Sequence, residues 1–357
     1  MVPTTQKTVV LLTGATGYIG GSVLAQLLAL PDASSKFDFR AIVRNSEKAR
    51  KFKDLLGVNA IVGSHGDREL MVREASQADV VLAMADCDDI EALGATLDGL
   101  KKRYEATGKA PVLFHTSGTV FLYLGVISDN AGGELSQIIW DDTDIAQMGK
   151  IASDAPHRRG ELKVLNADQE GYVKSYILLP SAIYGVLNNP VVDAGIQNTR
   201  SQLFDPGLFP AAFAKGRGFV VGKGDNIWPI AHIDELAEVY TRLFVAVTDD
   251  EGFPHGTEGY YLIAADEVRF YDLAEAVSEA LNDLGELEGT STDPTQITKE
   301  ECTRYYGSMP GLVGSNMRCA SNRARTRLGW TPTKTTKDLL ATVRGEVESY
   351  KLSLEKA

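Results

Sequence analysis

The stretch TVVLLTGATGYIG, residues 8–20, decides the fold, because a β-branched apolar run leads directly into closely spaced glycines. Residues 8–12 predict a buried strand, since several β-branched and aliphatic side chains follow one another without a polar interruption. Residues 18–30 predict a helix with one apolar face, which Pro31 and Asp32 end. The chain therefore opens with a strand–turn–helix unit.

The glycines of this unit have the spacing of a diphosphate-binding corner. Gly14 permits the sharp turn, Gly17 lets the backbone approach a diphosphate, and Gly20 lets the helix lie close to the strand. The helix then directs its free N–H groups and the positive end of its dipole toward the phosphates. The first gap is one residue longer than the usual dinucleotide fingerprint, but the strand-before, helix-after context predicts a dinucleotide site. The other predicted contacts of this loop are Ala15, Thr16, Tyr18 and Ile19.

The rest of the first half repeats the alternation of strand and helix. A second helix is expected at residues 46–56, opened by a Ser46 cap. Further strands are expected at residues 39–43, 60–62, 79–84, 112–114 and 176–179. Strand, helix, strand in this rhythm indicates parallel pairing with right-handed crossovers. We therefore predict an α/β fold: a doubly wound parallel Rossmann sheet with a smaller, irregular C-terminal substrate domain.

The second half of the chain is less regular. Residues 188–225 are rich in Gly, Pro and Phe, which indicates loops with short elements. Helices are expected at residues 232–247, 267–281 and 335–352, and Asp234 is expected to cap the first of them. We assign residues 1–185 plus about 227–250 to an NAD(P)-binding Rossmann domain. About 186–226 and 251–357 are assigned to a smaller substrate-binding domain.

The end of the second strand, IVRNS at residues 42–46, bears on the choice of cofactor. An NAD site usually has Asp or Glu here for the ribose 2′-hydroxyl, whereas an Arg suits a 2′-phosphate. No acidic residue lies between Phe39 and Ser46, and Arg44 with Ser46 or Lys48 could hold a phosphate. The sequence favours NADP(H), with NAD as the alternative, and a plain surface arginine is the simpler interpretation of Arg44.

Composition and charge exclude several classes of protein. The formal charge of −12 at pH 7 disfavours contact with nucleic-acid phosphates. No apolar run reaches the roughly 20 residues that a membrane helix needs, and the short polar N-terminus does not resemble a signal peptide. The cysteines, Cys87, Cys302 and Cys319, are scattered and lack metal-ligand spacing. We therefore expect a cytosolic protein without a metal, with a small-molecule substrate and either a homodimer or a regulatory protein as its partner.

Four ordered segments resemble the extended short-chain dehydrogenase/reductase superfamily across nearly the whole chain. These segments are HTSGTV at 115–120, LPSAIYG at 179–185, WPIAHIDELA at 228–237 and LGWTP at 328–332. The resemblance implies that Ser117 is the serine that orients the substrate, and that Pro180 begins the segment beside the nicotinamide. The remaining predicted cofactor contacts are Ser64, His65, Ala83, Met84, Ala85, Thr116, Ala182 and Ile183, together with His157.

The catalytic pair of that superfamily is missing. No Tyr-x-x-x-Lys occurs between Ser117 and Pro180. Two landmarks locate the positions that this pair would take: the distance from Pro180, and Glu161 as the superfamily's common acidic residue. By these landmarks, the Tyr and Lys positions fall near Ser153 and His157. Because Pro156 fits only a first helical turn, a helix is expected to begin around Asp154 with an acidic cap. His157 could replace the lysine as a ribose contact or proton relay. A structural histidine at this position is an equally open interpretation.

Three functions remain under consideration. The leading one is an NADP(H)-dependent oxidoreductase of a small carbonyl, alcohol or imine-type substrate, in which Ser117 orients the substrate and His157 or a water chain moves the proton. The second is a redox-sensing regulatory protein, because the chain also resembles the nitrogen-metabolite-repression regulators in Val43-Arg44-Asn45 and in lacking the catalytic pair. The third, a sugar-nucleotide epimerase or dehydratase, is disfavoured because such enzymes keep the Tyr and Lys.

Overall fold

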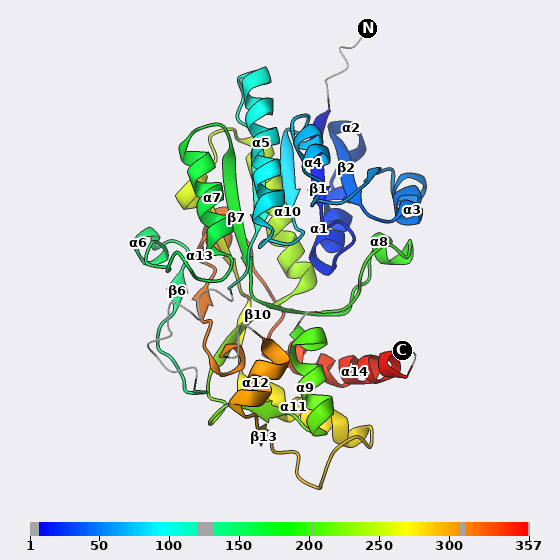
Figure 1. The fold of residues 1–357 in the computed structure, drawn as a ribbon, viewed down its shortest axis with the longest axis vertical. Helices are drawn as coiled ribbons and strands as arrows, with labels where there is room; N and C mark the ends of the chain where they lie inside the picture. The colour runs from blue at the N-terminus through cyan, green and yellow to red at the C-terminus, as the bar shows by residue number, and fades with distance from the viewer. Residues whose placement is uncertain (1–6, 120–131, 202, 308–310, 356–357) are drawn as a thin grey trace.

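The computed structural model describes residues 7–119, 132–201, 203–307 and 311–355 (Figure 1). Val120, the last residue of the predicted serine segment, lies outside these ranges. In Figure 1 the large sheet and its helices occupy the upper part of the view, and α9, α11, α12 and α14 gather in the lower part. Among the described residues, no helix is long and apolar enough to cross a membrane.

The large sheet has seven strands in the order β11-β7-β5-β4-β1-β2-β3 among the described residues, and every adjacent pair is parallel. Their bounds are β1 (Thr8–Thr13), β2 (Phe37–Val43), β3 (Asn59–Val62), β4 (Val80–Ala83), β5 (Val112–Thr116), β7 (Lys174–Pro180) and β11 (Tyr260–Ile263). The predicted doubly wound Rossmann sheet is confirmed, and its strand order reverses direction at β1, where such sheets bind ligands.

Both faces of this sheet are buried, which explains the uninterrupted apolar strands. Val10 and Leu12 of β1 point into one apolar core, whereas Val9 and Leu11 point into the other. The first core is covered by α1 (Tyr18–Leu28), α3 (Ser46–Leu56) and α10 (Ile233–Asp249). The second is covered by α4 (Arg68–Ala75), α5 (Ile90–Thr107) and α7 (Arg158–Gln169).

A third apolar core surrounds a small sheet in the order β12-β10-β8. These strands are β8 (Ala182–Tyr184), β10 (Ile227–His232) and β12 (Asp266–Arg269). Two-residue strands add the pairs β9 (Phe219–Val220) with β13 (Thr295–Gln296), and β6 (Trp140–Asp141) with β14 (Cys319–Ala320). The remaining α-helices are α2 (Ala33–Lys36), α6 (Ile145–Met148), α8 (Pro190–Asp193), α9 (Phe209–Lys215), α11 (Phe270–Asp283), α12 (Lys299–Tyr306), α13 (Asn322–Leu328) and α14 (Thr336–Leu354).

Two predicted helix caps and one predicted helix start are wrong, and each has a local reason, although α3 spans residues 46–56 as predicted. Asn45, not Ser46, caps α3, because its side chain accepts a hydrogen bond of 2.9 Å from the Lys48 amide. The imidazole of His232 accepts from the Asp234 amide, so the histidine caps α10 and the aspartate does not. α7 begins at Arg158 rather than near residue 154, since the backbone of His157 is left-handed at φ 64°.

Strand β11 does not follow the predicted limits of the two domains. β11 pairs with β7 at the edge of the large sheet, although the predicted limits place residues 251–357 with the smaller domain. The division into two domains therefore stays a prediction, with β11 as a segment that crosses back.

The helix–strand contact at Gly20 gives a stability prediction. A Cβ at this position would lie 2.2 Å from the Gly14 carbonyl oxygen, so Gly20→Ala must push α1 away from the turn. We expect the free energy of unfolding in urea to fall by ~1–3 kcal/mol. Gly345→Ala in α14, where a Cβ would meet nothing within 4 Å, is the control and should be neutral or stabilising. Equal losses in both variants would contradict this account.

Candidate functional site

The turn between β1 and α1, residues 14–17, forms a cradle that begins and ends with a glycine. Gly14 has φ 73°, and a Cβ there would lie 2.3 Å from the Met84 carbonyl oxygen, so the loops after β1 and β4 meet backbone to backbone. No side chain caps α1, and its first turn has no acidic residue. By contrast, Asp67 and Asp89 cap α4 and α5. The α1 terminus is therefore left for an external anion, which fits the diphosphate of a dinucleotide.

A segment from the second half of the chain, which contains Gln197 and Asn198, forms hydrogen bonds with this turn and the start of α1. The Asn198 amide donates to the Thr16 carbonyl at 2.8 Å, and the Gln197 side chain donates to the Tyr18 carbonyl at 2.8 Å. The Tyr18 hydroxyl in turn donates to the Gly185 carbonyl at 2.5 Å. The sequence analysis missed Gln197 and Asn198, because nothing in their local pattern marks a contact about 180 positions away.

The residues predicted for the adenosine end lie after β2 and β3. Arg44 is exposed and makes no hydrogen bond or ion pair within the part of the chain that the structure describes. Lys48, one of its two predicted helpers, donates from Nζ to the Ile196 carbonyl at 2.6 Å. Ser64 and His65 are half-buried after β3, and His65 Nε2 lies 3.5 Å from Asp89 Oδ2. Arg44 is thus an exposed arginine, without a partner among the described residues, directly after β2.

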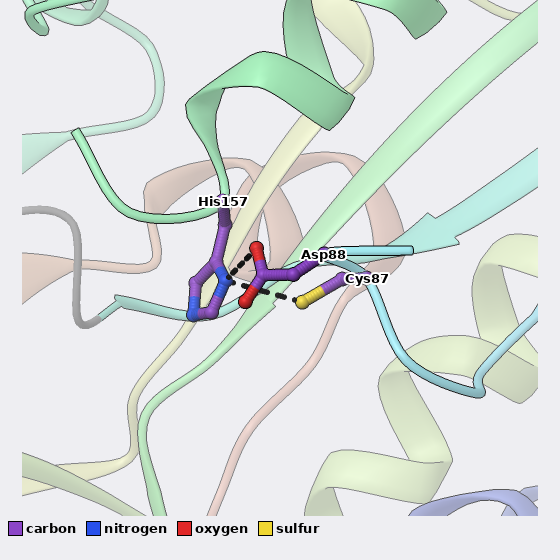
Figure 2. Close-up of side chains that lie close together, drawn as sticks. All are labelled: Cys87, Asp88 and His157. Atoms are coloured by element: carbon purple, nitrogen blue, oxygen red, sulfur yellow. Dashed lines mark hydrogen bonds and ion pairs between the residues drawn. The ribbon is translucent and has the colours of Figure 1, made fainter. Parts of the chain in front are cut away.

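His157 lies close to two polar side chains, those of Asp88 and Cys87 (Figure 2). Its Nδ1 lies 2.8 Å from Asp88 Oδ1 and 3.2 Å from Cys87 Sγ. Both neighbours come from the loop between β4 and α5, whereas His157 directly precedes α7. A left-handed backbone is costly for a residue other than glycine, so the surrounding structure must hold His157 in place.

The other side of the His157 ring faces the end of β5. A Cβ added to Gly118 would lie 3.7 Å from His157 Nε2, so the ring packs against this glycine, next to Ser117. The Asp88 carboxylate favours a proton on Nδ1, which leaves Nε2 of the neutral ring as an acceptor. Asp88 and His157 therefore form an Asp–His pair, and the Nε2 of His157 faces the segment that carries Ser117.

A buried polar network fixes the first turn of α7. The Ser117 hydroxyl donates to Glu161 Oε1 at 2.6 Å, and Arg158 donates to Glu161 Oε2 at 2.9 Å and to the Tyr260 hydroxyl at 2.6 Å. Glu161 is fully buried, and burial raises the pKa of its carboxyl against the effect of these donors. The sequence analysis used Glu161 only as a landmark and missed Arg158 and Tyr260, although the i, i+3 spacing of Arg158 and Glu161 is a signal for a helical pair.

Burial also changes the titration of two neighbours of His157. It lowers the pKa of His115 to about 4, with the charge of His157 as the next contribution, and no partner meets the His115 Nε2 among the described residues. Burial, followed by the carboxylates of Asp88 and Asp86, raises the pKa of Cys87 to about 12. His115 is therefore neutral and the Cys87 thiol protonated near pH 7.

The other predicted site residues lie either at the carboxyl edge of the large sheet or on the surface. The carboxyl ends of β1, β4 and β5 bring Gly14, Met84 and Thr116 to the same edge of the sheet. Pro180 ends β7, and Ala182 and Ile183 lie half-buried in β8. Ser153 is exposed ahead of α7. A small pocket next to the end of β1 has a lining that includes Thr13, His65, Ala83, Ala85, Cys87 and His115.

Comparisons with known proteins find similarity to a family model in the first part of the chain and to two relatives over most of its length. Residues 6–98 match the profile of the NmrA-like family. A protein named Oxidase ucsJ from Acremonium sp is 26% identical over 96% of this chain and 98% of its own. An uncharacterized protein of Schizosaccharomyces pombe is 24% identical over 92% of this chain and 96% of its own.

Solved structures show the same fold at lower identity. The UDP-glucose 4-epimerase of Thermotoga maritima, solved with UDP-glucose, has a TM-score of 0.60 and 14% identity over 97% of this chain and 100% of its own. The UDP-glucuronic acid 4-epimerase of Bacillus cereus, solved with UDP-glucuronic acid and NAD, has a TM-score of 0.58 and 13% identity over 96% and 100%. The chain therefore has the α/β fold of the NAD-dependent epimerases and dehydratases.

His115 gives a prediction on pH and stability. Because its folded pKa of about 4 lies below the unfolded value of 6.5, its contribution is present above pH 6.5 and is lost as pH falls toward 4. The full loss corresponds to about 3 kcal/mol. We expect unfolding curves to show a smaller decrease in stability over this range for His115→Leu than for the native chain. Parallel pH profiles of the two proteins would contradict a buried neutral His115.

Proposed function

We propose that this chain is an NADP(H)-dependent oxidoreductase acting on a small carbonyl, alcohol or imine-type substrate. The observation that carries the proposal is the Asp88–His157 pair, with 2.8 Å between Oδ1 and Nδ1, at the sheet edge that also carries the glycine cradle. A titratable imidazole with one nitrogen held and the other available is suited to move a proton. His157 would thus take the part that the resemblance assigns to the missing lysine.

Three sets of residues would hold the cofactor. Gly14 to Gly17 and the uncapped end of α1 would bind the diphosphate, and Arg44 would bind the 2′-phosphate. Thr116 and Pro180, at the ends of β5 and β7, would border the nicotinamide. When bound, NADPH supplies the hydride for reduction, and the protein supplies orientation and the proton.

His157 would donate the proton to the substrate oxygen or nitrogen from Nε2 when the ring is protonated. Asp88 stabilises the charged ring and fixes its orientation through Nδ1. Ser117 would orient the same substrate atom, and to do so its hydroxyl must turn away from Glu161, to which it donates. The buried Arg158 and Tyr260 keep Glu161 hydrogen-bonded during that exchange.

Cofactor preference is testable at Arg44. Removing a charge-assisted hydrogen bond to phosphate should raise the NADPH dissociation constant by about 10- to 100-fold in Arg44→Ser. NADH, which lacks the 2′-phosphate, should bind both proteins alike. Calorimetry measures both constants, and Arg50→Ser on the exposed side of α3 is the matched control. Equal weakening for NADH, or none for NADPH, would count against a 2′-phosphate contact.

Proton transfer is testable at His157. We expect His157→Gln to lower kcat for NADPH-dependent reduction by ~10²–10⁴-fold while NADPH remains bound, because a general acid is lost and the cradle is unchanged. Nicotinamide absorbance with a panel of carbonyl substrates gives the rate. Asp88→Asn should lower kcat as well, since Asp88 stabilises the charged ring.

The matched control is His255→Gln, because His255 pairs with Asp168 at the far end of α7, with 2.8 Å between Nδ1 and Oδ2. Its kcat should equal that of the native chain. A native rate in His157→Gln would exclude the histidine as the proton donor. No turnover by the native chain on any substrate would remove the oxidoreductase proposal.

A regulatory function is the second candidate, favoured by the NmrA-like match over residues 6–98 and by the missing Tyr and Lys. It requires NADP(H) binding without turnover, together with a protein partner recovered on the purified chain. A sugar-nucleotide epimerase or dehydratase is a third candidate because of the shared fold, and a thermal shift with a nucleotide sugar would support it. A homodimer stays an expectation, as do a cytosolic location and the absence of nucleic-acid or membrane partners.

A further inference from the structure

Three side chains with different metal-ligand atoms converge beside the cradle (Figure 2). Cys87 offers a sulfur, Asp88 a carboxylate oxygen and His157 a ring nitrogen, and these atoms all lie within 4.8 Å of one another. The first two are adjacent in the β4–α5 loop, and the third is 69 positions beyond Asp88. Because His157 is so far from the other two residues in sequence, the chain shows no close ligand spacing, and the sequence therefore predicts no metal.

We propose that Cys87, Asp88 and His157 form a binding site for Zn²⁺ or a divalent cation of similar softness. The proposal goes beyond the oxidoreductase function and does not require it. A thiolate with an imidazole selects zinc-like ions over Mg²⁺ or Ca²⁺, which prefer oxygen ligands alone. Three protein ligands also match zinc sites that keep a fourth position open for water or another small ligand.

The distances suit such an ion after a small adjustment. Zinc bonds of about 2.3 Å to sulfur and about 2.0–2.2 Å to nitrogen and oxygen give tetrahedral edges of about 3.5 Å for S···N and about 3.3 Å for N···O. The present separations from His157 Nδ1 are 3.2 Å to Cys87 Sγ and 2.8 Å to Asp88 Oδ1. The ligands must therefore open by only a few tenths of an ångström.

The surroundings allow that opening and favour a cation. The Asp88 side chain is 59% exposed, so it can rotate without disturbing the core, whereas His157 is held at 18% exposure. Asp86 adds a second carboxylate next to the cysteine. On binding, the cation takes the place of the thiol proton, which leaves to solvent. The proton of the neutral His157 ring moves from Nδ1 to Nε2, and the cation occupies the Nδ1 that Asp88 otherwise contacts.

The site overlaps with the groups of the proposed proton transfer, and this consequence rests on the proposed function. A metal on Nδ1 prevents the ring from becoming the doubly protonated acid that Asp88 stabilises. Bound Zn²⁺ and proton donation by His157 are therefore mutually exclusive, and Zn²⁺ should inhibit turnover. Metal binding itself is measurable with or without turnover, so failure of either proposal is visible separately.

The test is a Co²⁺ titration of the tag-free, chelator-treated full chain, followed by absorption. We expect one equivalent of Co²⁺ to produce visible tetrahedral bands and a near-ultraviolet thiolate-to-cobalt band, both of which Zn²⁺ then removes. Cys87→Ser should lose the thiolate band, and Cys302→Ser, which changes a distant buried thiol of α12, should keep it. Asp88→Asn at an exposed position should weaken Co²⁺ binding at least about tenfold.

Two results would overturn the metal site. One is the absence of a thiolate-to-cobalt band in the native chain under conditions in which it is folded by circular dichroism. The other is a band that survives Cys87→Ser and disappears with Cys302→Ser, because the ligand would then lie elsewhere. An unchanged Co²⁺ affinity in Asp88→Asn would exclude the carboxylate as a ligand and reduce the proposed set to two residues.

Discussion

The backbone-to-backbone contact between Gly14 and Met84 is the constraint on which the rest of the site depends. A Cβ at Gly14 would lie 2.3 Å from the Met84 carbonyl oxygen, and φ there is 73°, so steric and conformational limits both require glycine. The contact sets the direction in which α1 leaves β1 and, at the same time, the path of the chain leaving β4. The close approach of Gly14 to Met84 therefore positions both the diphosphate cradle and the loop that carries Cys87 and Asp88.

A buried network of charged and polar side chains determines the position of His157. Arg158, Glu161 and Tyr260 form hydrogen bonds with one another in the interior, and Ser117 donates to Glu161. Removing one member of such a buried network is strongly destabilising. The network holds the first turn of α7 against β5 and β11, and this position brings His157 to Asp88. The resemblance implies tyrosine and lysine positions near Ser153 and His157, but in this chain the helix begins only at Arg158, and the His157 imidazole lies just before it.

The fold could be predicted because its signals are local. Apolar runs, the spacing of glycines and the alternation of strand and helix are all read within about a dozen residues, and the parallel sheet follows from their order. The sequence also singled out His157, four residues before Glu161, as a candidate. Helix caps and the start of α7 were less predictable: the left-handed backbone of His157 and the capping by Asn45 and His232 depend on contacts that composition does not reveal.

The sequence by itself determined the strand–turn–helix cradle, since its glycines act through their own backbone and need no distant partner to be recognised. Only the tertiary structure decided what stands beside that cradle. Asp88 and Cys87 meet His157 because parallel strands end at one edge of a sheet and bring loops 69 and 70 positions apart into contact. Side-chain chemistry across such a distance depends on where packing places α7, and no local pattern in the chain encodes that position.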